Sequence, residues 1–336
     1  MFSNKKNTLL YASIFLAVSL QAHGMENKQN QEFHSIIMPG LNGGGGADHI
    51  DNNVVNTLNP SRYTPLKGWN IDLGQGNCIR DFERQFNQDT QAKNKQRLFF
   101  GISQGTATLT NWLAQKSHSE QEKAAKLLVL EGVLGSGNSA IMHNAHSYAH
   151  PLITYLPFAR AWIPFVAKVF FPTYNPFGKQ AICSAKKLSR KLPVVILHNK
   201  KDPETPINDA REYYCTLREQ GNNNAYLMEV DNGAAHFDVL SQDYRRDGFP
   251  GRNTKIEALQ AIYRQHDLPT APSSEATSGG TPKNPELALQ YQPSVQEVRH
   301  RISQTNGYKN FFRNSIDLVS SALILGGIWW KYFSKK

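Results

Sequence analysis

The chain has 336 residues, of which 40% are hydrophobic, and its 37 lysines and arginines outnumber its 27 aspartates and glutamates, giving a formal charge of +10. This length and apolar content allow one large folded domain, and they exclude a wholly disordered chain, a collagen-like chain and a many-spanning membrane protein. A surplus of positive charge is typical of proteins that meet nucleic acids or anionic membranes, so its position along the chain matters.

The N-terminus has the order of a secretory signal peptide. Two lysines precede an apolar run over residues 8–20, and small residues follow at Ala22 and Gly24. A basic start, a short apolar stretch and a small-residue exit are features that signal peptides share; a buried N-terminal helix is the alternative. We therefore expect residues 1–24 to be removed and the protein to be exported to a periplasmic, lumenal or extracellular compartment.

The C-terminus combines a short apolar segment with basic flanks. Residues 318–330 are uncharged and end in Trp329 and Trp330, and three lysines follow. As a helix this segment spans about 20 Å, less than the roughly 30 Å of bilayer hydrocarbon, yet tryptophan and lysine suit a membrane interface. Two interpretations stay open: membrane association through residues 311–336, as a short anchor or a surface helix, or a helix docked on the domain.

Composition divides the rest of the chain into three parts. Residues 31–266 form one domain's worth of sequence, residues 267–297 are poor in apolar residues and predict a flexible linker, and residues 298–336 form a basic tail. Much of the positive surplus lies in that tail, and the domain shows no basic stripe. We therefore expect no nucleic-acid partner and interpret the charge as targeting and anchoring charge. Three cysteines do not make a disulfide framework.

Five short apolar runs within residues 31–266 predict strands that are buried on both faces. Helix-length segments separate them, among them residues 106–115 and 208–220. This alternation predicts an α/β fold with a mostly parallel central sheet flanked by helices. The runs are Ser35–Met38, Leu98–Ile102, Leu127–Leu130, Val194–Leu197 and Ala225–Val230.

The second run ends in a pattern that is typical of a nucleophilic serine. Gly101-Ile102-Ser103-Gln104-Gly105 has small residues on both sides of the serine, which lets it adopt a strained turn between a strand and a helix. The five-residue pattern also recurs by chance, and its position at the end of a predicted strand is what gives it weight. The alternative is a serine that merely caps the following helix.

An acid and a histidine follow the last two runs. Asp202 lies on the loop after the fourth run, and His236 lies on the loop after the fifth. Because the carboxyl ends of parallel strands meet at one edge of a sheet, we expect Ser103, Asp202 and His236 to converge there as nucleophile, acid and base. Asp209 and Asp231 are rival acids, the first placed to begin the next helix and the second close to His236 on its own loop.

With these residues, the sequence resembles the α/β-hydrolase superfamily over residues 33–262. The resemblance rests on the serine pattern, on the Pro-x-x-Pro after Asp202 and on the Gly-x-x-His-Phe around His236. It implies an acyl-enzyme mechanism in which the backbone N–H groups of Leu41 and Gln104 hold the oxyanion, with Asn42 as a less favoured substitute for Leu41.

One departure from the superfamily lies in the loop that should carry Leu41. Many relatives have His-Gly where this chain has Pro39-Gly40, but the oxyanion donors are backbone groups, so the change need not abolish function. The run Gly43–Gly46 lacks the Gly-Lys-Ser/Thr of a phosphate-binding Walker loop.

Residues 140–189 are expected to form a cap over the active site, as is common in this superfamily. Their many aromatic residues could line a pocket for an acyl chain or form the cap's own core. His143, His146 and His150 have the spacing of one helix face, but no carboxylate or cysteine nearby completes a metal shell. We therefore expect no metal and no cofactor.

These features together predict an exported, membrane-associated serine hydrolase that cleaves a small-molecule or lipid ester. An apolar or fatty-acyl group is the expected acyl part of the substrate. From another class, the alternative is a catalytically silent, hydrolase-like binding or adhesion protein at the membrane. Within the enzyme class, peptidases, thioesterases and acyltransferases use the same triad.

Overall fold

A computed structural model of the chain describes most of the residues between 33 and 305. The described residues are 33–41, 61–64, 70–90, 92, 95–148, 168–169, 171–178, 180–231, 236, 252–268 and 290–305. The signal peptide expected at residues 1–24 and the apolar segment 318–330 lie outside them.

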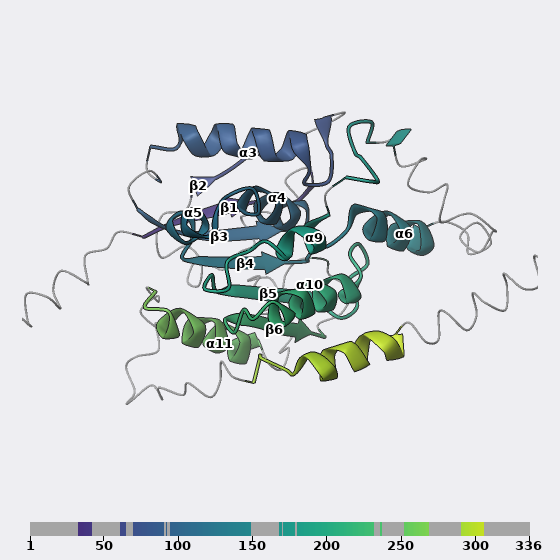
Figure 1. Ribbon diagram of the computed structural model, residues 1–336. Coiled ribbons are helices and arrows are strands. Elements are labelled where there is room, and N and C mark those ends of the chain that lie inside the picture. The colour runs from purple at the N-terminus through teal and green to yellow at the C-terminus, as the bar shows by residue number, and fades with distance from the viewer. Residues whose placement is uncertain are drawn as a thin grey trace, which may run out of the picture.

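The centre of the domain is a six-stranded sheet in which every neighbouring pair of strands is parallel (Figure 1). The strand order is β2-β1-β3-β4-β5-β6. The strands are β1 (Phe33–Met38), β2 (Ser61–Arg62), β3 (Gln96–Ile102), β4 (Leu127–Glu131), β5 (Val194–Asn199) and β6 (Ala225–Val230). The predicted α/β fold with a parallel sheet is confirmed.

Each of the five predicted apolar runs lies within a strand, and the strand often extends beyond it. β3 begins two residues before its run, at Gln96, and β5 continues through His198 to Asn199. β2 is a strand that the apolar pattern did not predict, because it has only two residues, Ser61 and Arg62, and neither is apolar. Such a short edge strand is defined by its pairing with β1 and not by its own composition.

Helices cover both faces of the sheet. They are α3 (Gly76–Gln88), α4 (Gln104–Leu113), α5 (His118–Ala124), α6 (Gly137–Tyr148), α9 (Ala181–Ala185), α10 (Ile207–Glu219) and α11 (Arg252–Gln265). Side chains of α3, α4, α9 and α10 join the core on one face, and those of α11 join the core on the other.

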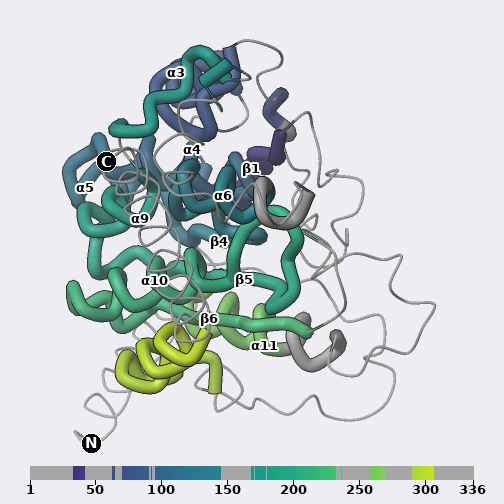
Figure 2. Tube along the Cα trace, turned by 90° about the vertical axis from the view of Figure 1, so that its right-hand side faces the viewer, coloured from purple at the N-terminus to yellow at the C-terminus, as the bar shows by residue number. Residues whose placement is uncertain are grey.

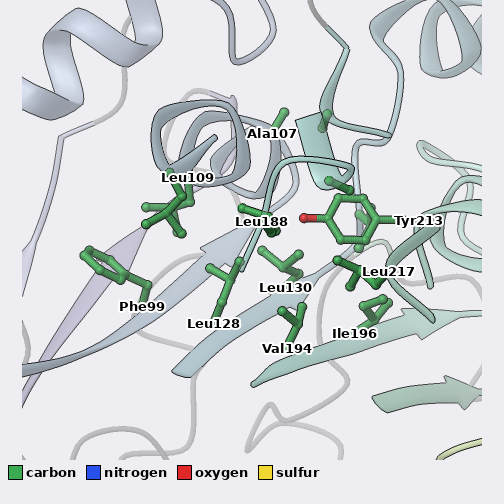
Figure 3. Packing of buried hydrophobic residues seen from close by; sticks show 14 of the residues in the cluster. Phe99, Ala107, Leu109, Leu128, Leu130, Leu188, Val194, Ile196, Tyr213 and Leu217 are labelled. Carbon is green, nitrogen blue, oxygen red and sulfur yellow. The ribbon is translucent and has the colours of Figure 1, made fainter. Parts of the chain in front are cut away.

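Alternating residues of the central strands supply the two cores. In β4, Leu128 and Leu130 belong to the core under α4 and α10, whereas Leu127 and Val129 belong to the core under α11. Figure 3 shows Leu128 and Leu130 beside the side chains that β5 and α10 contribute to the first core. Because both faces of a parallel strand are buried in this way, the strands appear in the sequence as continuous apolar runs.

Residues 290–305 also pack against the domain. Residues 295–305 form a helix that buries Val298 completely and Ile302 almost completely, and the Tyr291 carbonyl accepts a hydrogen bond from the N–H of Leu227 at 2.8 Å. This helix is the yellow element below β6 in Figure 1. Residues 290–297, which we expected to belong to the flexible linker, are therefore packed on the folded domain: Tyr291 and Val295 contact its two cores, and the Tyr291 carbonyl is hydrogen-bonded to β6.

The carboxyl ends of the strands point to the right in Figure 1, and α6 lies beyond them. Figure 2 views the domain from that side and shows α6 in front of the sheet.

Within the described part of the chain, no helix is long and apolar enough to cross a membrane. Cys78 and Cys215 are buried, Cys183 is exposed, and all three are free thiols.

Candidate active site

Ser103 lies on a strained turn between β3 and α4. Its φ and ψ angles are 51° and −117°, a conformation that residues with side chains rarely adopt. The Ser103 N–H donates to the carbonyl of Glu131 at 2.9 Å, so the turn is tied to the end of β4. Ser103 occupies the N-cap position of α4, but its hydroxyl makes no capping hydrogen bond. The helix-capping alternative therefore does not explain this serine.

The two glycines that flank Ser103 are needed because backbone passes close to each of them. A methyl group on Gly105 would overlap the carbonyl oxygen of Met38 and lie 2.8 Å from its carbonyl carbon and 2.9 Å from the Pro39 oxygen. A methyl group on Gly101 would lie 3.0 Å from the Gly105 carbonyl. The Gly-x-Ser-x-Gly pattern thus reflects close packing of β3, the start of α4 and the loop after β1.

The same packing brings together the two segments that carry the predicted oxyanion donors. Gln104 is the first residue of α4 and is buried, so its backbone N–H belongs to the group at a helix start that has no partner within the helix. Leu41 is the last described residue of the loop that crosses Gly105, and Asn42 lies outside the described residues.

Asp202 is a buried carboxylate that is held by its own loop. Its Oδ1 accepts the backbone N–H groups of Glu204 and Thr205, each at 2.8 Å, and its Oδ2 accepts the Thr205 hydroxyl at 2.8 Å. The same Oδ2 lies 2.7 Å from Nδ1 of His236. Burial by itself would raise the pKa of Asp202, but the hydrogen bond and charge of His236, with smaller effects of His198 and Thr205, hold it below its usual range.

His236 is 5% exposed and lies against Gly132, the residue after β4. A methyl group on Gly132 would be 3.1 Å from Cε1 of the imidazole, which is tighter than an ordinary contact, and the φ angle of 60° at this position also favours glycine. The preceding residue, Glu131, accepts the Ser103 N–H. The imidazole and the serine are therefore both anchored at residues 131 and 132.

The pKa of His236 is raised. Burial alone would lower it, but the hydrogen bond and charge of Asp202, followed by the charges of Glu204 and Glu131, outweigh that effect. The site therefore stabilises an imidazolium, the ion that forms when the histidine accepts a proton.

The two alternative candidates for the triad acid, Asp209 and Asp231, have other partners. Asp209 lies in the first turn of α10, where it accepts the Ser136 N–H at 2.9 Å and the Ser139 hydroxyl at 2.7 Å, and burial raises its pKa to about 7. Asp231 pairs with Lys201 at 3.0 Å on the surface. The structure therefore brings Asp202, and neither of these residues, to the ring of His236.

His198 is a buried residue of the site that the sequence did not single out. Its Nδ1 accepts the backbone N–H of Val133 at 3.1 Å, so Nε2 carries the proton and donates to the Thr205 carbonyl at 3.2 Å. Burial lowers its pKa to about 4, so the ring is neutral at pH 7. His198 joins the loop after β4 to the loop of Asp202. The only signal in the sequence was a histidine at the end of a buried apolar run.

The helix α6 contacts the loop that carries Asp202. His143 Nε2 lies 3.0 Å from the Asp202 carbonyl oxygen, and the Asn144 amide donates to the Glu204 carbonyl at 2.7 Å.

Among the aromatic residues of the expected cap, Tyr174 is fully buried and Phe177 is 81% exposed. The side chains of His146 and His150 lie outside the described residues. Within the part of the chain that is described, no three potential ligands form a metal-binding group.

The strand order, the strained serine after β3 and the Asp–His pair on the loops after β5 and β6 are those of the α/β-hydrolase fold. No protein-family model matches the sequence, and no curated protein matches it.

Solved structures with a similar arrangement include two esterases and a protein named Est1E. Esterase Pf2001 of Pyrococcus furiosus is 14% identical, with a TM-score of 0.47 over 71% of this chain and 84% of that chain. Est1E of Butyrivibrio proteoclasticus is 13% identical, with a TM-score of 0.44 over 70% and 88%. Esterase RhEst1 from Rhodococcus sp. is 12% identical, with a TM-score of 0.41 over 68% and 91%.

Proposed function

We propose that this protein is a serine hydrolase that cleaves an ester bond through an acyl-enzyme intermediate. The observation that carries the proposal is the 2.7 Å contact between Asp202 Oδ2 and His236 Nδ1. The same histidine lies against Gly132, and the neighbouring residue, Glu131, accepts the backbone N–H of Ser103. A buried carboxylate on one imidazole nitrogen leaves the other nitrogen to take a proton from a nearby hydroxyl.

In this mechanism the three side chains have separate roles. Asp202 holds the Nδ1–H of His236, so that Nε2 accepts the proton of Ser103 while Ser103 Oγ attacks the ester carbonyl. The backbone N–H groups of Leu41 and Gln104 hold the oxyanion of the tetrahedral intermediate. His236 Nε2–H then protonates the leaving alcohol, and water, activated by the same nitrogen, releases the acid from Ser103.

An apolar or fatty-acyl group is the acyl part that we propose. The aromatic content of residues 140–189 supports it, together with Phe177 and Val169, which are 81% and 66% exposed on the described portion of this segment. Large exposed apolar side chains that gather on a surface commonly contact an apolar ligand or surface. A series of nitrophenyl esters with increasing acyl length tests this point, and a preference for acetate would contradict it. Export and membrane association of the tail remain part of the proposal.

Labelling with a fluorophosphonate probe tests the enzyme class, because the probe reacts only with an activated serine. We expect the wild-type protein to be labelled and the Ser103→Ala variant not to be. Equal labelling of both proteins, or no labelling of the wild type, would overturn the proposal and favour a silent, hydrolase-like binding protein. A panel of ester, thioester and peptide substrates then separates the hydrolase classes that share the triad.

A further inference from the structure

A second carboxylate lies at the opposite edge of His236 from Asp202. Glu204 Oε2 is 3.6 Å from Nε2 of His236, the nitrogen that would transfer the proton in the proposed mechanism. The side chain of Asp202 is completely buried, whereas that of Glu204 is 48% exposed. Of the two carboxylates that contact the imidazole within the described residues, Glu204 is therefore the one that a substrate can approach.

The backbone of Glu204 is held in place from two sides. Its N–H donates to Asp202 Oδ1 at 2.8 Å, and its carbonyl accepts the amide of Asn144, on α6, at 2.7 Å. Glu204 is thus attached both to the loop of the acid and to the first helix of the cap. In the region that the structure describes, no lysine or arginine lies within ion-pair distance of its carboxylate. Its negative charge is therefore not paired with a lysine or an arginine there.

We propose that Glu204 is a specificity-determining residue that favours esters with a positively charged alcohol portion and disfavours those with a negatively charged one. This inference rests on the proposed function, because it assigns the substrate class of the same site. The leaving oxygen must lie within about 3 Å of Nε2 to receive its proton, which puts it no more than about 7 Å from the Glu204 carboxylate. A charged group a few bonds beyond that oxygen can then reach Glu204.

The other charged and titratable groups around the imidazole do not offer the same contact. Asp202, His198 and Glu131 all influence His236, but they are 4%, 0% and 3% exposed. A substrate cannot reach these buried groups, so among the residues that the structure describes around the imidazole, discrimination by charge falls to Glu204. Because Glu204 is half exposed, water and salt screen its charge, and we expect a preference of about three- to tenfold at low ionic strength.

Three butyrate esters that differ only in the charge of the alcohol test the proposal. They are the choline ester, which is cationic, the 3,3-dimethylbutyl ester, which is its uncharged isostere, and the 2-sulfoethyl ester, which is anionic. We expect kcat/KM of the wild type to decrease in that order. In Glu204→Gln the ratio of choline to neutral ester should fall by about three- to tenfold, and in Glu204→Lys the order should reverse. Raising the salt concentration should weaken the wild-type preference.

The matched control is Glu83→Gln on α3, since Glu83 has the same side-chain exposure of 48% and the substitution removes the same charge. Its ratios should equal those of the wild type. A choline-to-neutral ratio in Glu204→Gln within twofold of the wild-type ratio would overturn the inference, as would a wild type that prefers the anionic ester. Loss of all activity in Glu204→Gln would also overturn it, because Glu204 would then be required for the chemistry itself. If the wild type hydrolyses none of the esters and is not labelled at Ser103, the proposed function fails instead.

Discussion

The start of α4 touches the end of β1 directly, because Gly105 lies against the carbonyl group of Met38 with no room for a side chain. This contact joins two segments that are far apart in the sequence. One carries the N–H of Gln104 and the other leads to Leu41, the two predicted oxyanion donors. The contact therefore matters for the geometry of the site as well as for packing.

Substituting Gly105 by alanine should strongly reduce the activity of the protein. The new methyl group would force α4 and the loop after β1 apart, and overpacking of this kind costs about 1 to 3 kcal/mol of unfolding free energy. We expect esterase activity to fall by about 100-fold, the effect of losing one oxyanion donor. Gly76→Ala on α3 is the control, because the nearest atom to its methyl group would be 3.7 Å away. An active Gly105→Ala protein would show that this contact does not set the donor geometry.

Substituting Asp202 by asparagine should reduce kcat by about 10³- to 10⁴-fold, because the amide no longer holds His236 in the proton-accepting tautomer. Labelling by the fluorophosphonate probe should slow in parallel. Asp231→Asn removes the same charge from the loop of His236, but its carboxylate pairs with Lys201 on the surface, so we expect activity close to that of the wild type. A greater loss in Asp231→Asn than in Asp202→Asn would identify Asp231 as the acid.

The pH profile of kcat/KM should report the raised pKa of His236. The imidazole must be neutral to accept the proton of Ser103, so activity should fall as the pH decreases through a pKa above the ordinary value of 6.5. The charge of Glu204 is one of those that raise this pKa, so Glu204→Gln should shift the acidic limb to lower pH. The Glu83→Gln protein should keep the wild-type limb. A shift upward in Glu204→Gln would contradict the assignment.

His198 should make the fold sensitive to acid. Its pKa is about 4 in the folded protein and 6.5 in a model peptide, so the unfolded chain binds the proton more readily between these pH values. The free energy of unfolding should therefore fall as the pH decreases through this window, by about 2 kcal/mol between pH 7 and pH 5.

Urea unfolding of wild type and His198→Asn at both pH values tests this prediction. The asparagine keeps an acceptor for the Val133 N–H, but its amide is too short to donate to the Thr205 carbonyl, so we expect a loss of about 1 to 3 kcal/mol at pH 7. It has no proton to gain, so its stability should change less between pH 7 and pH 5. Equal changes in the two proteins would mean that His198 is not the acid-sensitive group.

The helix at residues 295–305 should contribute to the stability of the domain. Val298 is fully buried in it, so Val298→Ala should lower the free energy of unfolding by about 2 kcal/mol in a single cooperative transition. Arg299→Ala is the neighbouring control: its ion pairs with Glu212 and Glu219 are partly exposed and should contribute less than about 1 kcal/mol. If Val298→Ala changes stability no more than Arg299→Ala, this helix does not form part of the cooperative unit.

Local patterns in the sequence are enough to predict the strands and the turn of the serine. Both faces of the central strands are buried, so they appear as apolar runs, and all five predicted runs are strands. The strained turn at Ser103 requires small residues on both sides, so a five-residue pattern predicts it. The loops of Asp202 and His236 were placed because each follows such a run.

Which residues contact one another depends on the folded arrangement of distant segments. The sequence favours Asp202 over its rivals Asp209 and Asp231, and the contact with His236 distinguishes them, since a pairing depends on how the loops after β5 and β6 approach each other. His198 was hidden in an apolar run, because its bonds reach backbone of two other loops. The docking of residues 290–305 on β6 likewise depends on contacts between distant segments. Local sequence patterns predict which segments are buried and where turns occur, because both depend on neighbouring residues. Contacts between distant segments form only when the chain folds, so no local pattern predicts them.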